Sequence, residues 1–312
     1  MPVIDKKSTF MRFKLEELCL NGNLNGIKSM MTSSGFSGIF SFGVNTYKNY
    51  RNTRKSIDLG LEIGFNISKR KTFLISCIPM GVKVHTSLMH AEVSVRSDMA
   101  LALVKELKNK FDQIIIVADP NFLKKLVEDG IEAGINWKSF NVSLISGEDW
   151  FSESFRSYIM DLIGADFDHP EKGYYAATMG IAELDLNVFH ESIDTIRIRR
   201  AAQNDKELRY ALFGKKVETC PILYHYYPHR IFLESLPDNS PDSELVFSML
   251  SQDMKIPLIR YNSKDCGRVF TYNQVEEILK NYGYDNLCPK LKLPMVAVYG
   301  RKARRVCLGK IA

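Results

Sequence analysis

A cluster of small hydroxyl residues and glycines is the part of the sequence best suited to chemistry. Residues 31 to 38 read Met-Thr-Ser-Ser-Gly-Phe-Ser-Gly. Glycines let backbone amides approach an anion closely, and serine and threonine hydroxyls add hydrogen-bond donors. The cluster predicts a phosphate-binding loop whose contacts are Ser33, Ser34, Gly35, Ser37 and Gly38. An ordinary surface turn is the alternative, since the stretch is neither a Walker A loop nor Gly-x-Gly-x-x-Gly.

Four further stretches follow this loop in a particular order. They are Ile-Ser-Gly-Glu-Asp-Trp at 145–150, Met-Gly-Ile-Ala-Glu at 179–183, Ile-Arg-Tyr-Asn-Ser-Lys-Asp at 259–265 and Tyr-Gly-Arg at 299–301. The ordered set resembles the adenylate-forming superfamily, specifically its phenylacetate-CoA ligase-like branch. The resemblance covers roughly Thr32 to Arg301. It implies ATP-dependent adenylation of a carboxylic acid, which gives an acyl- or aryl-adenylate and pyrophosphate.

The resemblance also implies a role for each motif. The Ser/Gly loop would bind the ATP phosphates, and the adenine would lie against Gly147 and Glu148 on one side and Met179 and Gly180 on the other. As catalytic residues it implies Glu183, which would bind magnesium, and Arg301, which would lie near the nucleotide. Asp265 would accept hydrogen bonds from both ribose hydroxyls.

Elementary chemistry supports these residue types. Attack of a carboxylate on the α-phosphate of ATP joins two anions, so the site must neutralise charge. The Glu183 carboxylate offers hard oxygen ligands of the kind that magnesium prefers. A carboxylate such as Asp265 can accept two hydroxyl groups at once. The alternatives are a solvated Glu183 at a helix start and an Asp265 that caps a turn, while Arg260 is expected to make a structural ion pair.

Several positions depart from the family pattern. Met179 stands where relatives have an aromatic residue, Ala182 replaces a threonine, and Phe36 interrupts the phosphate loop. The basic residues of 302–305 replace an acidic hinge, and the mobile C-terminal domain with its catalytic lysine is expected to be missing. These departures favour two other interpretations: a catalytically impaired protein that binds a nucleotide or a small aromatic molecule, and an acyl-transfer scaffold that acts with a partner protein.

Histidines and one cysteine are further candidates. His85 and His90 fall in the region that lines the carboxylate pocket of relatives, so they are substrate-binding candidates, with ordinary loop packing as the alternative. His225 and His229 flank Pro228, a strand-like spacing that favours structural roles over metal binding. Cys307 could carry an acyl group, as in an acyl-protein synthetase branch of relatives, but a plain reduced thiol is favoured.

The elements that position these residues alternate from Ser97 onward. Helices are expected over 97–111, 120–134 and 151–164, and strands over 112–119, 141–146 and 174–178, a pattern that predicts a parallel, helix-covered sheet. A helical stretch at 194–213 precedes short strands at 220–227, 230–236, 244–250, 256–261 and 268–272.

The expected fold class is therefore α/β with a β-rich, barrel-like C-terminal subdomain, as in the large N-terminal domain of adenylate-forming enzymes. Residues 1–214 are expected to form the nucleotide- and carboxylate-binding part, and residues 215–312 the β-rich subdomain of the same adenylation core.

Composition limits the possible partners. The 312 residues are 45% hydrophobic and 25% charged, as in a globular protein, and 42 basic against 36 acidic residues give a net charge of +6. This charge is scattered, which argues against a nucleic-acid partner. No apolar run approaches the roughly 18 residues of a membrane span, and the first residues do not form a secretory signal.

Six cysteines without a Cys-x-x-Cys pair favour reduced thiols and a cytoplasmic location. The expected cofactors are ATP and Mg²⁺. The expected partners are a small carboxylic acid and an acyl-acceptor protein, and a homodimer is left open.

Overall fold

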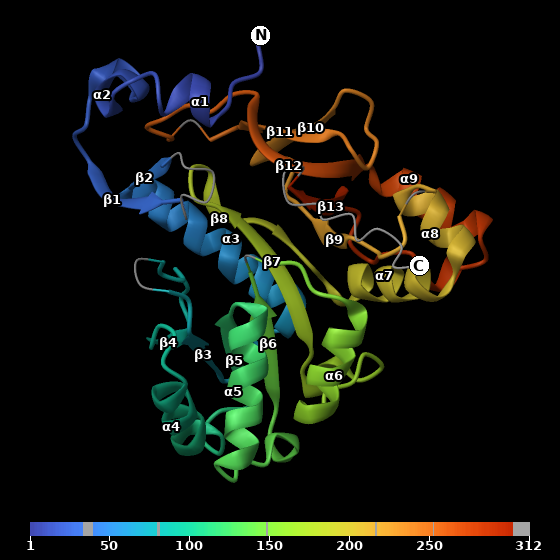
Figure 1. The fold of residues 1–312 in the computed structure, drawn as a ribbon. Helices are drawn as coiled ribbons and strands as arrows, with labels where there is room; N and C mark the ends of the chain where they lie inside the picture. The colour runs from blue at the N-terminus through green and yellow to red at the C-terminus, as the bar shows by residue number, and fades with distance from the viewer. Residues whose placement is uncertain (34–39, 80–81, 148, 216, 252, 302–312) are drawn as a thin grey trace, which may run out of the picture.

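The computed structural model describes residues 1–33, 40–79, 82–147, 149–215, 217–251 and 253–301 (Figure 1). Within these residues, eleven strands form one sheet in the order β10-β11-β12-β13-β9-β8-β7-β6-β5-β3-β4, and β1 pairs with β2 in a separate hairpin. None of the helices in the described ranges is both long enough and apolar enough to cross a bilayer.

The first half of the large sheet is parallel. It contains β3 (Thr72–Ser76), β4 (Met89–Glu92), β5 (Gln113–Ala118), β6 (Val142–Ser146) and β7 (Tyr175–Ile181). Strands β3, β5 and β6 are buried along their whole length, which is expected when helices cover both faces of a parallel sheet. In Figure 1, α5 (Pro120–Glu132) and α6 (Glu153–Ile163) lie in front of the strands, and α3 (Tyr47–Phe65) passes behind β7.

Local capping explains where the covering helices begin. Asp119 accepts a hydrogen bond from the Phe122 amide at 2.9 Å, and Pro120 occupies the first position of α5, where its missing N–H costs nothing. Ser152 caps α6 in the same way. Helix α4 (Ser97–Leu107) follows β4. The predicted alternation of helices and strands over this half is confirmed.

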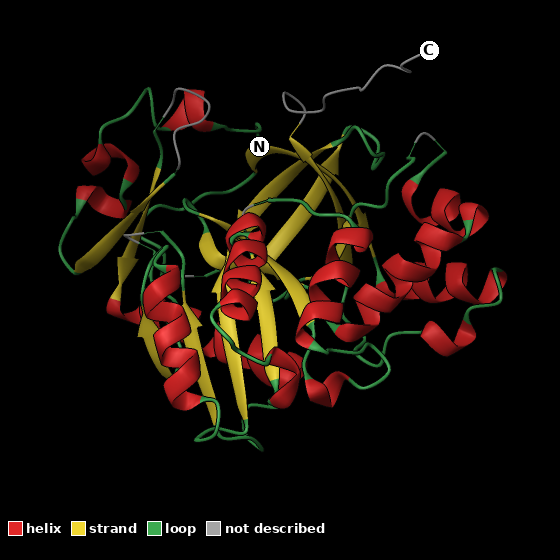
Figure 2. Cartoon of the chain, turned by 60° about the horizontal axis from the view of Figure 1, so that its bottom comes forward, coloured by secondary structure: helices red, strands yellow, loops and turns green. Residues whose placement is uncertain are grey.

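The second half of the sheet is antiparallel. It contains β8 (Asp185–His190), β9 (Ile222–His225), β10 (Ile231–Leu236), β11 (Glu244–Met249), β12 (Tyr261–Phe270) and β13 (Met295–Arg301). A second hydrophobic cluster packs β9, β12 and β13 against α7 (Ile193–Asn204), α8 (Lys206–Phe213) and α9 (Tyr272–Asn281). Figure 2 shows helices in front of the strands of the sheet. The predicted α/β fold class is confirmed.

The two halves share one sheet, because β7 and β8 form a hairpin and His190 of β8 pairs with His225 of β9. The antiparallel strands thus begin at Asp185, before the expected boundary at residue 215. The division into 1–214 and 215–312 stays a prediction.

Some predicted elements differ from the structure. The expected strand at 256–261 is wrong, and the one expected at 268–272 is the end of a longer strand over Tyr261–Phe270, with an irregularity between Cys266 and Gly267. Thr271 ends this strand by capping α9 through the Gln274 amide. The helix expected at 194–213 is two helices, since Asp205 caps the second one. β13 was not predicted.

The N-terminal segment lies beside the start of β12. It contains α1 (Lys6–Thr9) and α2 (Leu15–Leu18), and it leads into the hairpin of β1 (Ile27–Thr32) and β2 (Phe42–Thr46). Ile4 pairs with Tyr261 of β12 in an isolated bridge. Short 3₁₀ turns occur at 20–22, 137–139, 170–172 and 285–287.

Candidate active site

The β1–β2 hairpin lies against the turn between β7 and β8. Gly43 makes this possible, since a Cβ atom there would overlap the backbone carbonyl of Ala182. The close approach brings Ser41, at the base of the predicted phosphate loop, to Glu183, and the two side chains hydrogen-bond. The structure therefore joins two of the predicted motifs.

Glu183 is the centre of this arrangement. It is 4% exposed, and its Oε1 atom accepts hydrogen bonds from Ser41 Oγ and from Tyr261 Oη at 3.0 Å, and lies 2.9 Å from the Lys6 ammonium. Burial raises the pKa of Glu183, but the hydrogen bond from Ser41 and the charge of Lys6 outweigh it, so the pKa lies below its usual value. Glu183 is thus an ionised, buried carboxylate and not a solvated helix-start residue.

Asp265 and Arg301 form a second charged pair. They are register partners on β12 and β13, with Arg301 Nε 3.3 Å from Asp265 Oδ1. Asp265 is 5% exposed, and no described residue donates to its Oδ2 atom, which is buried. Burial outweighs the charge of Arg301 and the nearby Ser263 hydroxyl and raises the pKa of Asp265, and the charge of Glu183 acts in the same direction. A buried acceptor without a donor is costly, so this geometry fits a ligand hydroxyl.

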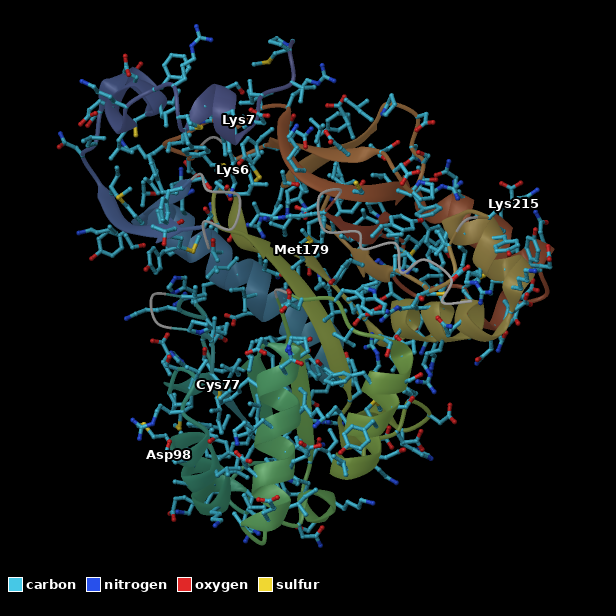
Figure 3. The ribbon with its side chains drawn as sticks, in the orientation of Figure 1. Lys6, Lys7, Cys77, Asp98, Met179 and Lys215 are labelled. Atoms are coloured by element: carbon cyan, nitrogen blue, oxygen red, sulfur yellow. The ribbon has the colours of Figure 1, made fainter. Side chains whose placement is uncertain are left out.

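The predicted adenine motifs meet at the ends of β6 and β7. These strands pair in parallel, so their carboxyl ends share one edge of the sheet, and a Cβ at Gly147 would lie 3.6 Å from the Thr178 carbonyl. Met179, labelled in Figure 3, is half-buried and pairs across the ladder with Phe189. Gly180 allows β8 to approach, because a Cβ there would lie 2.5 Å from the Leu186 carbonyl.

The predicted substrate histidines contact other described residues than Glu183. The His85 ring lies 3.9 Å from the Tyr50 ring of α3, and burial lowers the pKa of His85. His90 is exposed, with its Nδ1 atom 3.0 Å from the Leu88 carbonyl. Neither histidine belongs to the described lining of the pocket beside Glu183.

That pocket was not predicted. It has a volume of about 330 Å³, within the range of small-molecule sites, and lies between β2, α3 and the β7–β8 turn. Glu183, Lys55 and an ion pair of Asp185 with Arg230 provide its charge, and Thr53 donates to Asp185 at 3.0 Å. Further lining residues are Met31, Asn45, Asn49, Asn52, Met249, Met254 and Ile256. No local sequence signal joins these positions, because they come from elements far apart in the chain.

Several predicted positions lie outside the described residues. They are Ser34, Gly35, Ser37, Gly38, Glu148, Cys307 and the basic residues Lys302, Arg304 and Arg305. Of the phosphate loop, Ser33 is described, and its amide donates to the Ser41 carbonyl at 2.9 Å.

Two structural assignments agree with the sequence analysis. Arg260 pairs with Glu234, Nε to Oε2 at 3.0 Å. His225 is fully buried in β9, with its ring centre 6.1 Å from that of His190.

In the described ranges no three His, Cys, Asp or Glu side chains gather as a metal site. The Glu183 Oε1 atom already has three donors among the described residues, one of them the Lys6 ammonium, so a metal ion at this atom would have to displace them.

Comparison with known proteins gives one result. No protein-family model and no curated protein matches the chain. Among solved structures it is similar to 2-hydroxyisobutyryl-CoA ligase in an open conformation with 2-HIB-AMP and CoA, with a TM-score of 0.61 over 96% of this chain and 64% of that chain. The chain has the fold of the large N-terminal domain of adenylate-forming enzymes.

The same ligase in its thioesterification state gives a TM-score of 0.61 over 96% of this chain and 58% of that one. Sequence identity is 12% in both comparisons, so the likeness concerns the fold alone. This chain therefore spans about three fifths of the length of these two ligases. In this chain Asp265 and Arg301 lie on the neighbouring strands β12 and β13, and Glu183 lies in the turn between β7 and β8.

Proposed function

We propose that this chain binds ATP and uses it to adenylate a small carboxylic acid, releasing pyrophosphate. The observation that carries the proposal is Asp265, whose buried Oδ2 atom has no donor in the described part of the chain, while Oδ1 faces Arg301. A nucleotide ribose offers hydroxyl donors that would satisfy such an acceptor.

The proposed nucleotide would extend from Asp265 towards the hairpin of β1 and β2. Met179, Gly180, Gly147 and Glu148 would hold the base. Ser33 and the rest of the predicted loop, Ser34, Gly35, Ser37 and Gly38, would hold the phosphates. Support for this direction comes from Ser41, which connects the base of the loop to Glu183.

The chemistry joins two anions. A carboxylate oxygen of the acid attacks the α-phosphorus of ATP, the bond to the bridging oxygen breaks, and pyrophosphate leaves with the electron pair. Arg301 and Lys6 supply positive charge near this step, and a buried site strengthens such charges. Mg²⁺ accompanies ATP as the counter-ion of its phosphates, whereas its binding by Glu183 stays a prediction.

The acid remains unidentified. His85 and His90 stay its predicted contacts, and the pocket beside Glu183 offers a volume that suits a small molecule. An acyl-acceptor protein, a homodimer and a cytoplasmic location also stay predictions.

Pyrophosphate release with ATP and a panel of carboxylic acids tests the function. We expect release with at least one acid from the unmodified chain, and a loss of tenfold or more in ATP affinity for Asp265→Asn, since a hydrogen bond to a charged group contributes about 1.5–3 kcal/mol. Asp98→Asn is the matched control, because Asp98 is exposed and pairs with Arg96 at the start of α4 (Figure 3). Equal ATP affinity in both variants would contradict the role of Asp265.

A second candidate function is nucleotide binding without catalysis. Ala182 favours it, because this residue offers no hydroxyl where relatives of the predicted family carry threonine. ATP binding that depends on Asp265, together with no pyrophosphate release for any acid, would favour this candidate.

A further inference from the structure

Among the described residues, Lys6 is the cation that forms an ion pair with Glu183. Its Nζ atom lies 2.9 Å from Glu183 Oε1, and the two side chains are 16% and 2% exposed. The neighbouring Lys7 is exposed on the same short helix (Figure 3). Lys6 therefore pairs with Glu183, whereas Lys7 is exposed to solvent.

Contacts that do not involve Lys6 fix the backbone around it. The Ile4 amide donates to the Arg260 carbonyl at 3.0 Å, and the Asn262 amide donates to the Ile4 carbonyl at 2.7 Å. Asp5 lies 3.4 Å from the Lys264 ammonium. The N-terminal segment is thus attached to the strand that carries both Tyr261 and Asp265.

Aromatic packing anchors the other end of α1. The Phe10 ring lies edge-on to Phe42 of β2 at 5.2 Å and to Tyr261 of β12 at 6.3 Å. Lys6 is held between these two attachments, so placing its side chain at Glu183 requires little further ordering of the backbone.

The surroundings of Glu183 suit an ammonium better than a divalent ion. A buried carboxylate needs a compensating charge and hydrogen bonds, and Lys6, Ser41 and Tyr261 supply them. Magnesium in ATP sites is held by one or two carboxylates together with phosphate oxygens and waters, and here the Glu183 Oε1 atom already takes three donors, one of them a cation. An ammonium has three donors, and Glu183 takes one, so two N–H groups are left for phosphate oxygens.

We propose that Lys6 provides at Glu183 the positive charge that the family resemblance assigns to magnesium. Nucleotide binding then does not require a divalent ion held by Glu183. This inference rests on the proposed ATP site for its role in binding, while the exclusion of a metal from Glu183 can be tested without nucleotide.

The nucleotide experiment compares ATP affinity in EDTA and in magnesium for the full chain. For the unmodified chain, Lys6→Arg and the control Lys7→Met, we expect the ratio of the two dissociation constants to stay within about threefold. For Lys6→Met we expect a ratio of tenfold or more, because magnesium must replace the lost charge. An unmodified chain that needs magnesium as strongly as Lys6→Met overturns the inference.

The nucleotide-free experiment measures binding of millimolar Mn²⁺ by electron paramagnetic resonance. We expect Lys6→Met to gain a Mn²⁺ site that Lys6→Met with Glu183→Gln lacks, and the unmodified chain to have none that depends on Glu183. Lys6→Gln, which keeps a hydrogen-bond donor, serves if Lys6→Met does not fold. Equal Mn²⁺ binding with and without Lys6, including none in either, overturns the inference. If no variant binds ATP, the proposed function fails while this measurement still decides the role of Lys6.

Discussion

Tyr261 connects two parts of the site, Glu183 through its hydroxyl group and the N-terminal segment through its ring. It is fully buried, donates to Glu183 at 3.0 Å, and packs against Phe10 of the N-terminal segment. Burial and the charge of Glu183 raise the pKa of Tyr261, so the phenol remains a donor at physiological pH. A change at this residue should therefore affect both the carboxylate and the segment that carries Lys6.

Tyr261→Phe removes this donor and keeps the ring. We expect a loss of about 1–3 kcal/mol in the free energy of unfolding near pH 7, because a buried ionised carboxylate loses a hydrogen bond. The pKa of Glu183 is lowered in the folded state, so its contribution is complete above the unfolded value near 4.5 and is lost as the pH falls through the folded value. Urea unfolding between pH 3 and 7 should show the difference between variant and parent shrinking towards acid pH. A difference that is constant over this range would contradict the assignment.

The site residues that were predicted belong to short motifs, which can be recognised from neighbouring residues in the sequence. Glu183 and Asp265 lie in short motifs, and the structure places both in buried, charged surroundings. Lys6 and Ser41 were missed, because their roles come from contacts between segments far apart in the chain. No spacing of residue types along a sequence reports such contacts.

At the scale of elements, the β1–β2 hairpin depends on Gly43. A side chain there would meet the Ala182 carbonyl, a backbone group that cannot rotate away. The hairpin would then move from the β7–β8 turn, and Ser41 would lose its contact with Glu183.

Gly43→Ala should therefore lower ATP affinity by tenfold or more and cost about 1–3 kcal/mol of stability through overpacking. Gly60→Ala in α3 is the control, since a Cβ there would make an ordinary 3.6 Å contact with Asn187. We expect the control to gain about 0.5–1 kcal/mol, because alanine is the better helix former. Titration calorimetry with ATP and thermal unfolding measure both effects, and unchanged ATP affinity for Gly43→Ala would count against the hairpin's role.

The β8–β9 junction gives a second prediction at this scale. Burial lowers the pKa of His190 to about 3 and that of His225 to about 4, so both rings are neutral in the folded state. The unfolded chain takes up these protons below about pH 6.5, so the stability from the neutral rings is complete above that pH and is lost as the pH falls towards 4.

His190→Phe should remove one titrating ring from the junction. Between pH 6 and 4, we expect the slope of unfolding free energy against pH to fall by up to about 1.4 kcal/mol per pH unit. Chemical unfolding at a series of pH values measures this slope. An unchanged slope would mean that His190 is protonated in the folded protein.

Prediction of the elements succeeded where burial is continuous. The run Ile114 to Ile116 identifies a strand covered on both faces, and the helices around it alternate regularly. It failed over 256–272, where Arg260 and Lys264 adopt positive φ angles and an irregularity interrupts the ladder. Hydrophobic spacing carries no information about such backbone features.

At the scale of the whole molecule, one sheet contains both the parallel half and the antiparallel half. The parallel half ends at β7, and the strands that carry Asp265 and Arg301 pair in the antiparallel half. Glu183 lies in the turn of the β7–β8 hairpin, where one half passes into the other. Figure 1 shows this pair of strands. The N-terminal segment and the β1–β2 hairpin both reach this point, which explains why the candidate residues of distant motifs come together.

A crystal structure of the chain with a non-hydrolysable ATP analogue measures the proposed arrangement most directly. We predict a ribose hydroxyl within about 3 Å of Asp265 Oδ2, where a buried acceptor now has no donor among the described residues, and phosphate oxygens beside Lys6 and Ser33. A nucleotide bound elsewhere, with Asp265 Oδ2 satisfied by water or by the protein, would contradict this account.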